Sequence, residues 1–325
     1  MACSNVSASE DVMTFADYMR RHPELWANPL FWTSHHMELM GCQFQHVYDV
    51  SSMQDIHEDS PRKRQKRQKC HEKPSDEEWL ARSFSIPGKL EAITNILLSK
   101  GSVFNKSSKG PSFYFADRDV HQPLYTVFSR RKQPDQGVCQ DPLPLIGYLN
   151  YTTVIGPRTH QFLPRSKGGG VDYPLTPLGK KKYARVIPKE WKEDPYFVFV
   201  LLSIAQLQED RLKELKSISH LSRLLVASPF DRESIHLYQA HITSDFLRML
   251  DKPTSTRFQK DFPTIEHREI SFKPYETLRQ RILDELSVAN MPPHLSNRHD
   301  NISNKNVKRA HEQKDKGRFK RTRSS

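Results

Sequence analysis

Cysteine is scarce in this chain, and its four residues, Cys3, Cys42, Cys70 and Cys139, show no repeated spacing. A secreted scaffold held by disulfides places its cysteines more densely. Structural zinc sites place their ligands in close pairs, and these cysteines form none. The cysteine content therefore predicts a reducing compartment.

Long apolar runs are missing as well. The longest apolar stretch, residues 196–205, is much shorter than the roughly 20 residues that cross a bilayer, so we expect no membrane partner. The N-terminal sequence MACSNVSASEDVMTFADYMRR lacks the continuous apolar core of a signal peptide and carries acidic residues early. Export through the secretory pathway is therefore not expected.

Glycine is outnumbered by proline, and apolar residues are few. The 325 residues include 12 glycines and 22 prolines, only 36% are hydrophobic, and the mean hydropathy is −0.72. Such a composition predicts substantial irregular stretches and one moderate core in place of two.

Positive charge is present in excess and is concentrated in two short pieces. Residues 61–73 (PRKRQKRQKCHEK) carry a net charge of +6 and residues 298–325 carry +7. The whole chain carries +12, so all other residues together are close to neutral. Basic runs of this kind bind anionic partners or import receptors.

The first basic run resembles a nuclear import signal, which predicts a nuclear location and an import receptor as partner. Ser60 directly precedes Pro61, so a proline-directed kinase would place a phosphate dianion beside the cluster and weaken receptor binding. A solvated linker remains the alternative, and both basic pieces are also able to bind nucleic-acid phosphates without sequence preference. The predicted import residues are Arg62, Lys63, Arg64, Lys66, Arg67 and Lys69.

Changes in composition divide the chain into four parts. Residues 1–52 form an accessory N-terminal segment, and residues 53–75 form a flexible basic linker. An α+β domain follows at 76–290, and residues 291–325 form a disordered basic tail.

Hydrophobic periodicity and capping residues predict the elements of that domain and of the segment before it. The order of elements favours one α+β domain built of helices and a short sheet. Helices are expected at 11–22, after Ser75, at 89–100 before Gly101, over about 20 residues from Asp194, at 245–250 and at 275–289. Strands are expected at 113–117, 124–128, 145–156, 223–227, 235–242 and 265–272, and an irregular loop at 164–192.

Three stretches together resemble an uncharacterised family of filamentous-fungal proteins. They are DPYFVFVLLSIAQLQ, then RLLVAS, then IHLYQAHITSDFLRMLDKP, within residues 190–255. The resemblance is a fold-level pattern of apolar positions, and it implies a shared core without implying an activity, cofactor or catalytic residue.

Two sets of residues raise the question of metal chemistry. A zinc interpretation would use His35, His36, Cys42, His46, Cys70 and His71, but only Cys42 and His46 have a spacing that zinc sites use. A metal-dependent nuclease would use Asp231, Glu233, Glu266, Glu269 and Lys273. Turn residues and the wet face of a strand explain these acids more simply.

No catalytic motif is present. The sequence contains neither a G-x-S-x-G nucleophile elbow nor a Walker lysine. We therefore assign no catalytic, cofactor or metal residue and expect a nuclear protein with a non-enzymatic binding or regulatory role. The alternatives are a nucleic-acid-binding or metal-dependent nucleic-acid-processing protein, or an enzyme whose site is assembled from dispersed residues.

Overall fold

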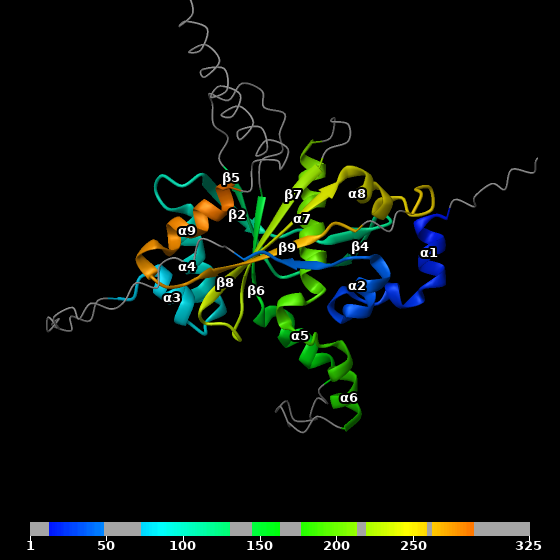
Figure 1. The fold of residues 1–325 in the computed structure, drawn as a ribbon, viewed down its shortest axis with the longest axis horizontal. Coiled ribbons are helices and arrows are strands. Elements are labelled where there is room, and N and C mark those ends of the chain that lie inside the picture. The colour runs from blue at the N-terminus through cyan, green and yellow to red at the C-terminus, as the bar shows by residue number, and fades with distance from the viewer. Residues whose placement is uncertain are drawn as a thin grey trace, which may run out of the picture. The chain divides into compact units, whose positions relative to one another are not determined.

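The computed structural model describes residues 13–48, 73–130, 145–162, 177–212, 219–258 and 262–288 (Figure 1). The features below belong to the compact unit that ends at Leu278, inside the last helix. Among the described residues, no helix is both long enough and apolar enough to cross a membrane.

A seven-stranded mixed sheet organises the unit, with strand order β1-β9-β8-β7-β6-β5-β2. The pairs β1–β9 and β6–β7 are parallel, and the other neighbours are antiparallel. The strands are β1 (Phe44–His46), β2 (Phe104–Lys109), β5 (Thr126–Arg130), β6 (Leu145–Asn150), β7 (Ser219–Ala227), β8 (Ser234–Thr243) and β9 (Ile265–Ser271). A separate two-stranded sheet joins β3 (Phe113–Phe115) to β4 (Arg118–His121).

Helix α7 (Tyr196–Leu212) covers one face of the large sheet. Every residue from Tyr196 to Ala205 is buried, because the sheet lies on one side of the helix and β3 with the N-terminal segment lies on the other. Gly147 of β6 permits the close approach, since a Cβ there would stand 2.8 Å from Cδ1 of Ile204. The apolar run that predicts a buried core helix is therefore confirmed.

Helices α3 (Asp76–Arg82) and α4 (Ile86–Leu98) lie on the other side of the sheet, where α4 contacts β2 and β6 (Figure 1). Their buried residues Leu80, Ile93 and Leu97 do not belong to the cluster around α7. The unit thus has two apolar cores separated by the sheet, which is a three-layer arrangement.

Residues 13–48, expected as an accessory segment, contribute to the core and to the sheet. Phe15, Trp32 and Met37 pack in the same cluster as α7, and β1 adds an edge strand beside β9. The helical elements here are α1 (Phe15–Arg21), η1 (Pro23–Trp26), η2 (Pro29–Phe31) and α2 (Ser34–Met40).

The expectation of a short sheet is wrong, because strands separated by long stretches of chain join into one sheet of seven. Two local expectations are wrong as well. Strand β6 ends at Asn150, whose side chain accepts a hydrogen bond from the amide of Thr152 and so begins helix α5 (Thr152–Phe162). The predicted loop at 164–192 contains helix α6 (Pro177–Val186) and the turn η4 (Trp191–Glu193).

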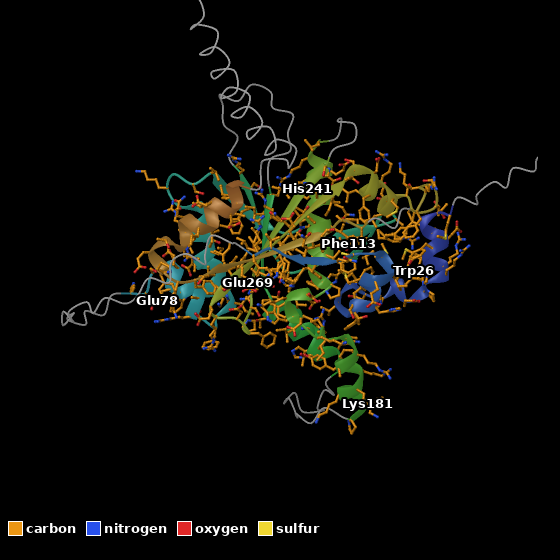
Figure 2. All side chains as sticks on the ribbon, in the orientation of Figure 1. Trp26, Glu78, Phe113, Lys181, His241 and Glu269 are labelled. Carbon is orange, nitrogen blue, oxygen red and sulfur yellow. The ribbon has the colours of Figure 1, made fainter. Side chains whose placement is uncertain are left out.

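Helix α6 projects away from the sheet beyond α5 (Figure 1), and the side chain of Lys181 points outward from it (Figure 2). The helix eluded prediction because three consecutive lysines and a glycine give it no apolar period.

The other predicted helices and strands are present with ends shifted by a few residues, and the predicted start of α7 at Asp194 is confirmed. The Asp194 carboxylate accepts from the amide of Tyr196, and the Thr243 hydroxyl accepts from the amide of Phe246. The last two helices are α8 (Ser244–Asp251) and α9 (Tyr275–Val288). The predicted linker before residue 73 and the predicted tail lie outside the described residues.

Candidate metal centre

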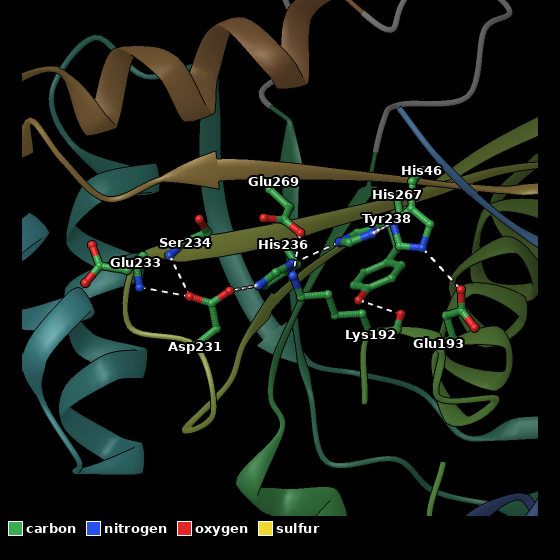
Figure 3. A network of polar contacts seen from close by, with 10 residues as sticks. All are labelled: His46, Lys192, Glu193, Asp231, Glu233, Ser234, His236, Tyr238, His267 and Glu269. Carbon is green, nitrogen blue, oxygen red and sulfur yellow. Dashed lines mark hydrogen bonds and ion pairs between the residues drawn. The ribbon is translucent and has the colours of Figure 1, made fainter. Parts of the chain in front are cut away.

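Three histidines from three neighbouring strands meet on the face of the sheet that α7 covers (Figure 3). His46 ends β1, His236 lies near the start of β8, and His267 lies in β9. His267 is in register with His46 on one side and with Tyr238 on the other. Strand pairing therefore places its imidazole between two neighbouring strands.

The imidazoles form a continuous chain of hydrogen bonds between two carboxylates. His236 Nε2 is 2.9 Å from Oδ2 of Asp231, and its Nδ1 is 2.9 Å from Nε2 of His267. His267 Nδ1 is 2.8 Å from Nδ1 of His46, whose Nε2 is 3.2 Å from Oε1 of Glu193. The chain thus runs from the β7–β8 turn to η4.

Aromatic side chains enclose the inner part of this chain. The ring of Tyr238 stacks on His267 with centroids 4.6 Å apart, and Trp191 meets His236 edge-on at 4.7 Å. His236 and His267 are 0% and 1% exposed. The Tyr238 hydroxyl also donates to the carbonyl oxygen of Lys192, which fixes η4 above the histidines.

His267 is neutral over the physiological range. Burial is the main cause, and the charges of His236, His46 and Lys192 add to it, so that its pKa falls to about 3. A neutral imidazole is the form that binds a metal ion.

Asp231 is ionised. Its burial alone would raise the carboxyl pKa, but the hydrogen bond from His236 and those from the backbone amides of Glu233 and Ser234 together lower it to about 2. The carboxylate therefore accepts from His236 Nε2, which leaves His236 Nδ1 as the bare nitrogen.

The number of protons that neutral imidazoles carry does not match the number of hydrogen-bond contacts along the histidine chain. The four contacts between Asp231, the three imidazoles and Glu193 each need one proton, whereas three neutral histidines carry only three. With the Asp231 end fixed, two bare acceptors face each other at His46 and Glu193 unless a fourth proton is added. A metal ion between His236 Nδ1 and His267 Nε2 would remove this mismatch, because three protons then serve three remaining hydrogen bonds.

Glu269 completes a candidate ligand set with the same two histidines. It lies opposite His236 in the β8–β9 register, and one ligand atom from each of His236, His267 and Glu269 lies within 4.8 Å of the others. A tetrahedral zinc ion with bonds of about 2.0–2.2 Å needs ligand atoms roughly 3.3 Å apart. His236 Nδ1 and His267 Nε2, 2.9 Å apart, would separate slightly, and the Glu269 carboxylate would approach them by up to about 1.5 Å.

The surroundings of these ligands match those of known metal sites. A ligating histidine usually donates its other nitrogen to a carboxylate or a similar partner, as His236 does to Asp231 and His267 does to His46. Two imidazoles with one carboxylate suit iron, zinc and other first-row divalent ions. In this structure Glu269 forms an ion pair with Lys192, whose Nζ lies 2.6 Å from Oε1 of the carboxylate.

The acids considered for a nuclease are distributed over different places. Asp231 and Glu269 reach the histidines, whereas Glu266, on the opposite face of β9, accepts from Nε2 of Gln239 at 2.7 Å. Glu233 is 3.5 Å from Lys273 at the exposed end of the turn. At the histidines the structure therefore brings together two of the five residues, and it adds His236 and His267, which no sequence motif indicates.

Among the residues considered for zinc, only His46 lies at the centre. His36 caps α2, with Nδ1 at Thr33, and His35 is exposed on the same helix. Cys42 is buried, and burial raises the pKa of its thiol to about 12, so it is a protonated core residue. Cys70, His71, Ser60 and the six predicted import residues lie outside the described residues.

Comparisons of the chain with protein-family models, with curated proteins and with solved structures found no match.

Proposed function

We propose that the folded unit binds a divalent transition-metal ion through His236, His267 and Glu269, and that the chain acts in the nucleus as a metal-dependent binding or regulatory protein. The observation that carries the metal proposal is the proton count. Three neutral imidazoles supply one proton too few for the four contacts, and an ion between His236 and His267 gives every remaining contact one donor.

The charges around the site also support a cation. Asp231, Glu193 and Glu269 surround the three imidazoles, and Lys192 is the cation that contacts Glu269. An ion at this place would cross-link β8 and β9, and through His46 it would hold the edge strand β1. Such a role is conformational and needs no turnover.

Equilibrium binding to the full-length protein tests the proposal. Metal-free protein is titrated with Zn²⁺ or Co²⁺ in competition with a chromophoric chelator. We expect one tight equivalent, and we expect Glu269→Gln, a change at an exposed position, to weaken it by at least the roughly 10- to 100-fold that changing a hydrogen-bond partner of a ligand costs.

The double variant His236→Gln/His267→Gln should abolish the tight equivalent. A matched control is His160→Ala/His241→Ala, which removes two exposed histidines from elsewhere. Circular dichroism establishes that each variant is folded. Equal binding by wild type, Glu269→Gln and the control would contradict the proposal even if the buried double variant fails to fold.

We propose nuclear import through Arg62, Lys63 and Arg64 with their basic neighbours, on the basis of charge density in the sequence. A fluorescent fusion of the full chain should be nuclear, and glutamine at these three positions should make it cytoplasmic. Glutamine at Lys180, Lys181 and Lys182 of α6 removes the same charge and should leave the fusion nuclear. Equal distribution of the two triple variants would contradict the assignment.

Phosphorylation of Ser60 would weaken this import, because it places a dianion beside the cluster. Ser60→Asp should shift the fusion toward the cytoplasm, and Ser60→Ala should not. A Ser60→Asp protein with the wild-type distribution would argue against this regulation.

Metal-dependent cleavage of nucleic acid is the second candidate. It is favoured by a ligand set of three protein groups, which leaves coordination positions for water and a phosphate oxygen. Mg²⁺-, Mn²⁺- and Zn²⁺-supplemented full-length protein is incubated with single- and double-stranded substrates. Asp231→Ala and Glu269→Ala must lose cleavage together, and activity that survives both changes excludes this centre.

A further inference from the structure

Helix α6 carries four cations on ten residues and no acid: Lys180, Lys181, Lys182 and Arg185. All four side chains are exposed, and none has an ion pair with any of the residues that the structure describes. The helix projects from the unit beyond α5, with Lys181 pointing outward (Figure 2). It is a basic helix whose charge is not neutralised by its described neighbours.

The cations are arranged around the helix in an unusual way. Since successive residues turn by about 100°, Lys180 and Lys182 differ by about 200°, and Lys181 and Arg185 fall between them. The exposed Pro177, Leu178 and Ala184 are the other residues of the helix within this arc. Both flanks and the outer side of the helix are therefore positive.

The remaining arc attaches the helix to the protein. Gly179 is buried, and the hydroxyl of Tyr183 accepts a hydrogen bond from Oγ1 of Thr159 at 3.3 Å. The ring of Tyr183 also meets Phe162 of α5 with centroids 6.1 Å apart. These contacts hold α6 by one side and leave the positive sides accessible.

We propose that α6 is a docking surface for duplex DNA, lying in the major groove with its two flanks against the two phosphate backbones. A helix of about 10–12 Å diameter fits the roughly 12 Å width of that groove. Cations separated by about 200° reach phosphates on both walls, which a flat anionic surface would not require. The major groove of duplex RNA is too deep and narrow to admit a helix. The contacts are to phosphate and carry no base readout.

The salt dependence of DNA binding tests this surface in the full-length chain. Anisotropy of a labelled duplex of about 20 base pairs is measured between about 50 and 200 mM salt. The triple variant Lys180→Gln/Lys182→Gln/Arg185→Gln should reduce the slope of log K against log salt concentration by about 2.7, which corresponds to three lost phosphate contacts. Glutamine keeps the helix propensity close to that of lysine.

The matched control is Lys109→Gln/Arg118→Gln/Lys252→Gln, which removes the same net charge from exposed positions elsewhere. It should leave the slope within about 0.5 of wild type. Equal losses in the two triple variants would show that only net charge matters and would overturn the proposal.

Two further measurements test whether the partner is duplex DNA and whether DNA binding is independent of the metal centre. Binding to duplex RNA of the same sequence should not change in the α6 variant, and an equal loss there would contradict placement in the DNA major groove. Glu269→Gln should bind DNA like wild type, because this surface does not depend on the metal centre.

Discussion

Lys192 is the residue that most directly opposes metal binding. Its ammonium contacts Glu269 at 2.6 Å, so an ion must displace it and then tolerate its charge nearby. Lys192→Gln should tighten Zn²⁺ binding by about tenfold, a value discounted for the partial exposure of both groups. Lys273→Gln is the control, because this lysine forms an ion pair with Glu233, which is not a proposed ligand. Weaker binding by the Lys192 variant would show that lysine supports the site.

Lys89 gives the folded protein a measurable pH dependence. It is 6% exposed, and burial, with a smaller contribution from Arg232, lowers its pKa from 10.5 to about 8. The unfolded chain therefore binds more protons than the folded one between pH 8 and 10.5, so this group makes stability rise with pH across that window.

We expect the free energy of unfolding of wild type, relative to Lys89→Met, to rise by about 2–3 kcal/mol from pH 8 to pH 10. Urea denaturation at several pH values measures it. The hydrogen bond from Lys89 to the carbonyl oxygen of Leu80 is absent from the variant at every pH. Its loss therefore adds a constant to the difference in unfolding free energy and does not change how that difference depends on pH. Parallel curves for the two proteins would contradict the depressed pKa.

Helix α7 depends on a buried ion pair at its start. Asp194 is 0% exposed and binds both terminal nitrogens of Arg158, at 2.6 and 3.0 Å, while capping the helix. Nε of Arg158 also donates to the carbonyl oxygen of Leu30, which ties α5, η2 and α7 together.

Asp194→Ala should lower the free energy of unfolding by about 3–5 kcal/mol, because it leaves a buried guanidinium without its counter-charge. Asp210→Ala, at an exposed position of the same helix, should change it by less than about 0.5 kcal/mol. The double variant Arg158→Met/Asp194→Leu should lose less than Asp194→Ala, and a larger loss would show that the pair itself is strongly stabilising.

Elements with a strong local signal were predictable, and those that depend on distant pairing were not. The run from Tyr196 to Ala205 is apolar on all sides, and Asp194 marks its start, so α7 could be placed. Helix α6 lacks an apolar period, and the seven-stranded sheet depends on pairings such as His46 with His267, 221 residues apart. Strand periodicity gives each strand its faces but does not select its neighbours.

The candidate site is also only partly predictable from the sequence, because it depends on how distant strands pair. Asp231 and Glu269 stand out in the sequence as acids in or near predicted strands, whereas His236 and His267 form no recognisable metal motif. His236 and His267 each lie on the inward face of a strand, next to Tyr238 and Glu269 at a spacing of two. This pattern was the available signal, and it becomes specific only once β8 and β9 are paired.

For the whole molecule, the metal proposal predicts a ligand-dependent stability. An ion that binds only the folded state stabilises it by about 2.7 kcal/mol at a free concentration 100 times its dissociation constant. Wild type should therefore melt at a higher temperature with Zn²⁺ than with chelator, and Glu269→Gln should show a much smaller shift at the same concentration. Equal shifts would place the bound ion elsewhere.

X-ray absorption spectroscopy of the full-length protein loaded with one equivalent of Zn²⁺ tests the metal centre most directly. The account predicts multiple scattering from two imidazoles, with nitrogen and oxygen ligands at about 2.0–2.2 Å and no sulfur. It also predicts loss of the imidazole signal in His236→Gln/His267→Gln. A spectrum without imidazole scattering, or one with a sulfur ligand at about 2.3 Å, would contradict it.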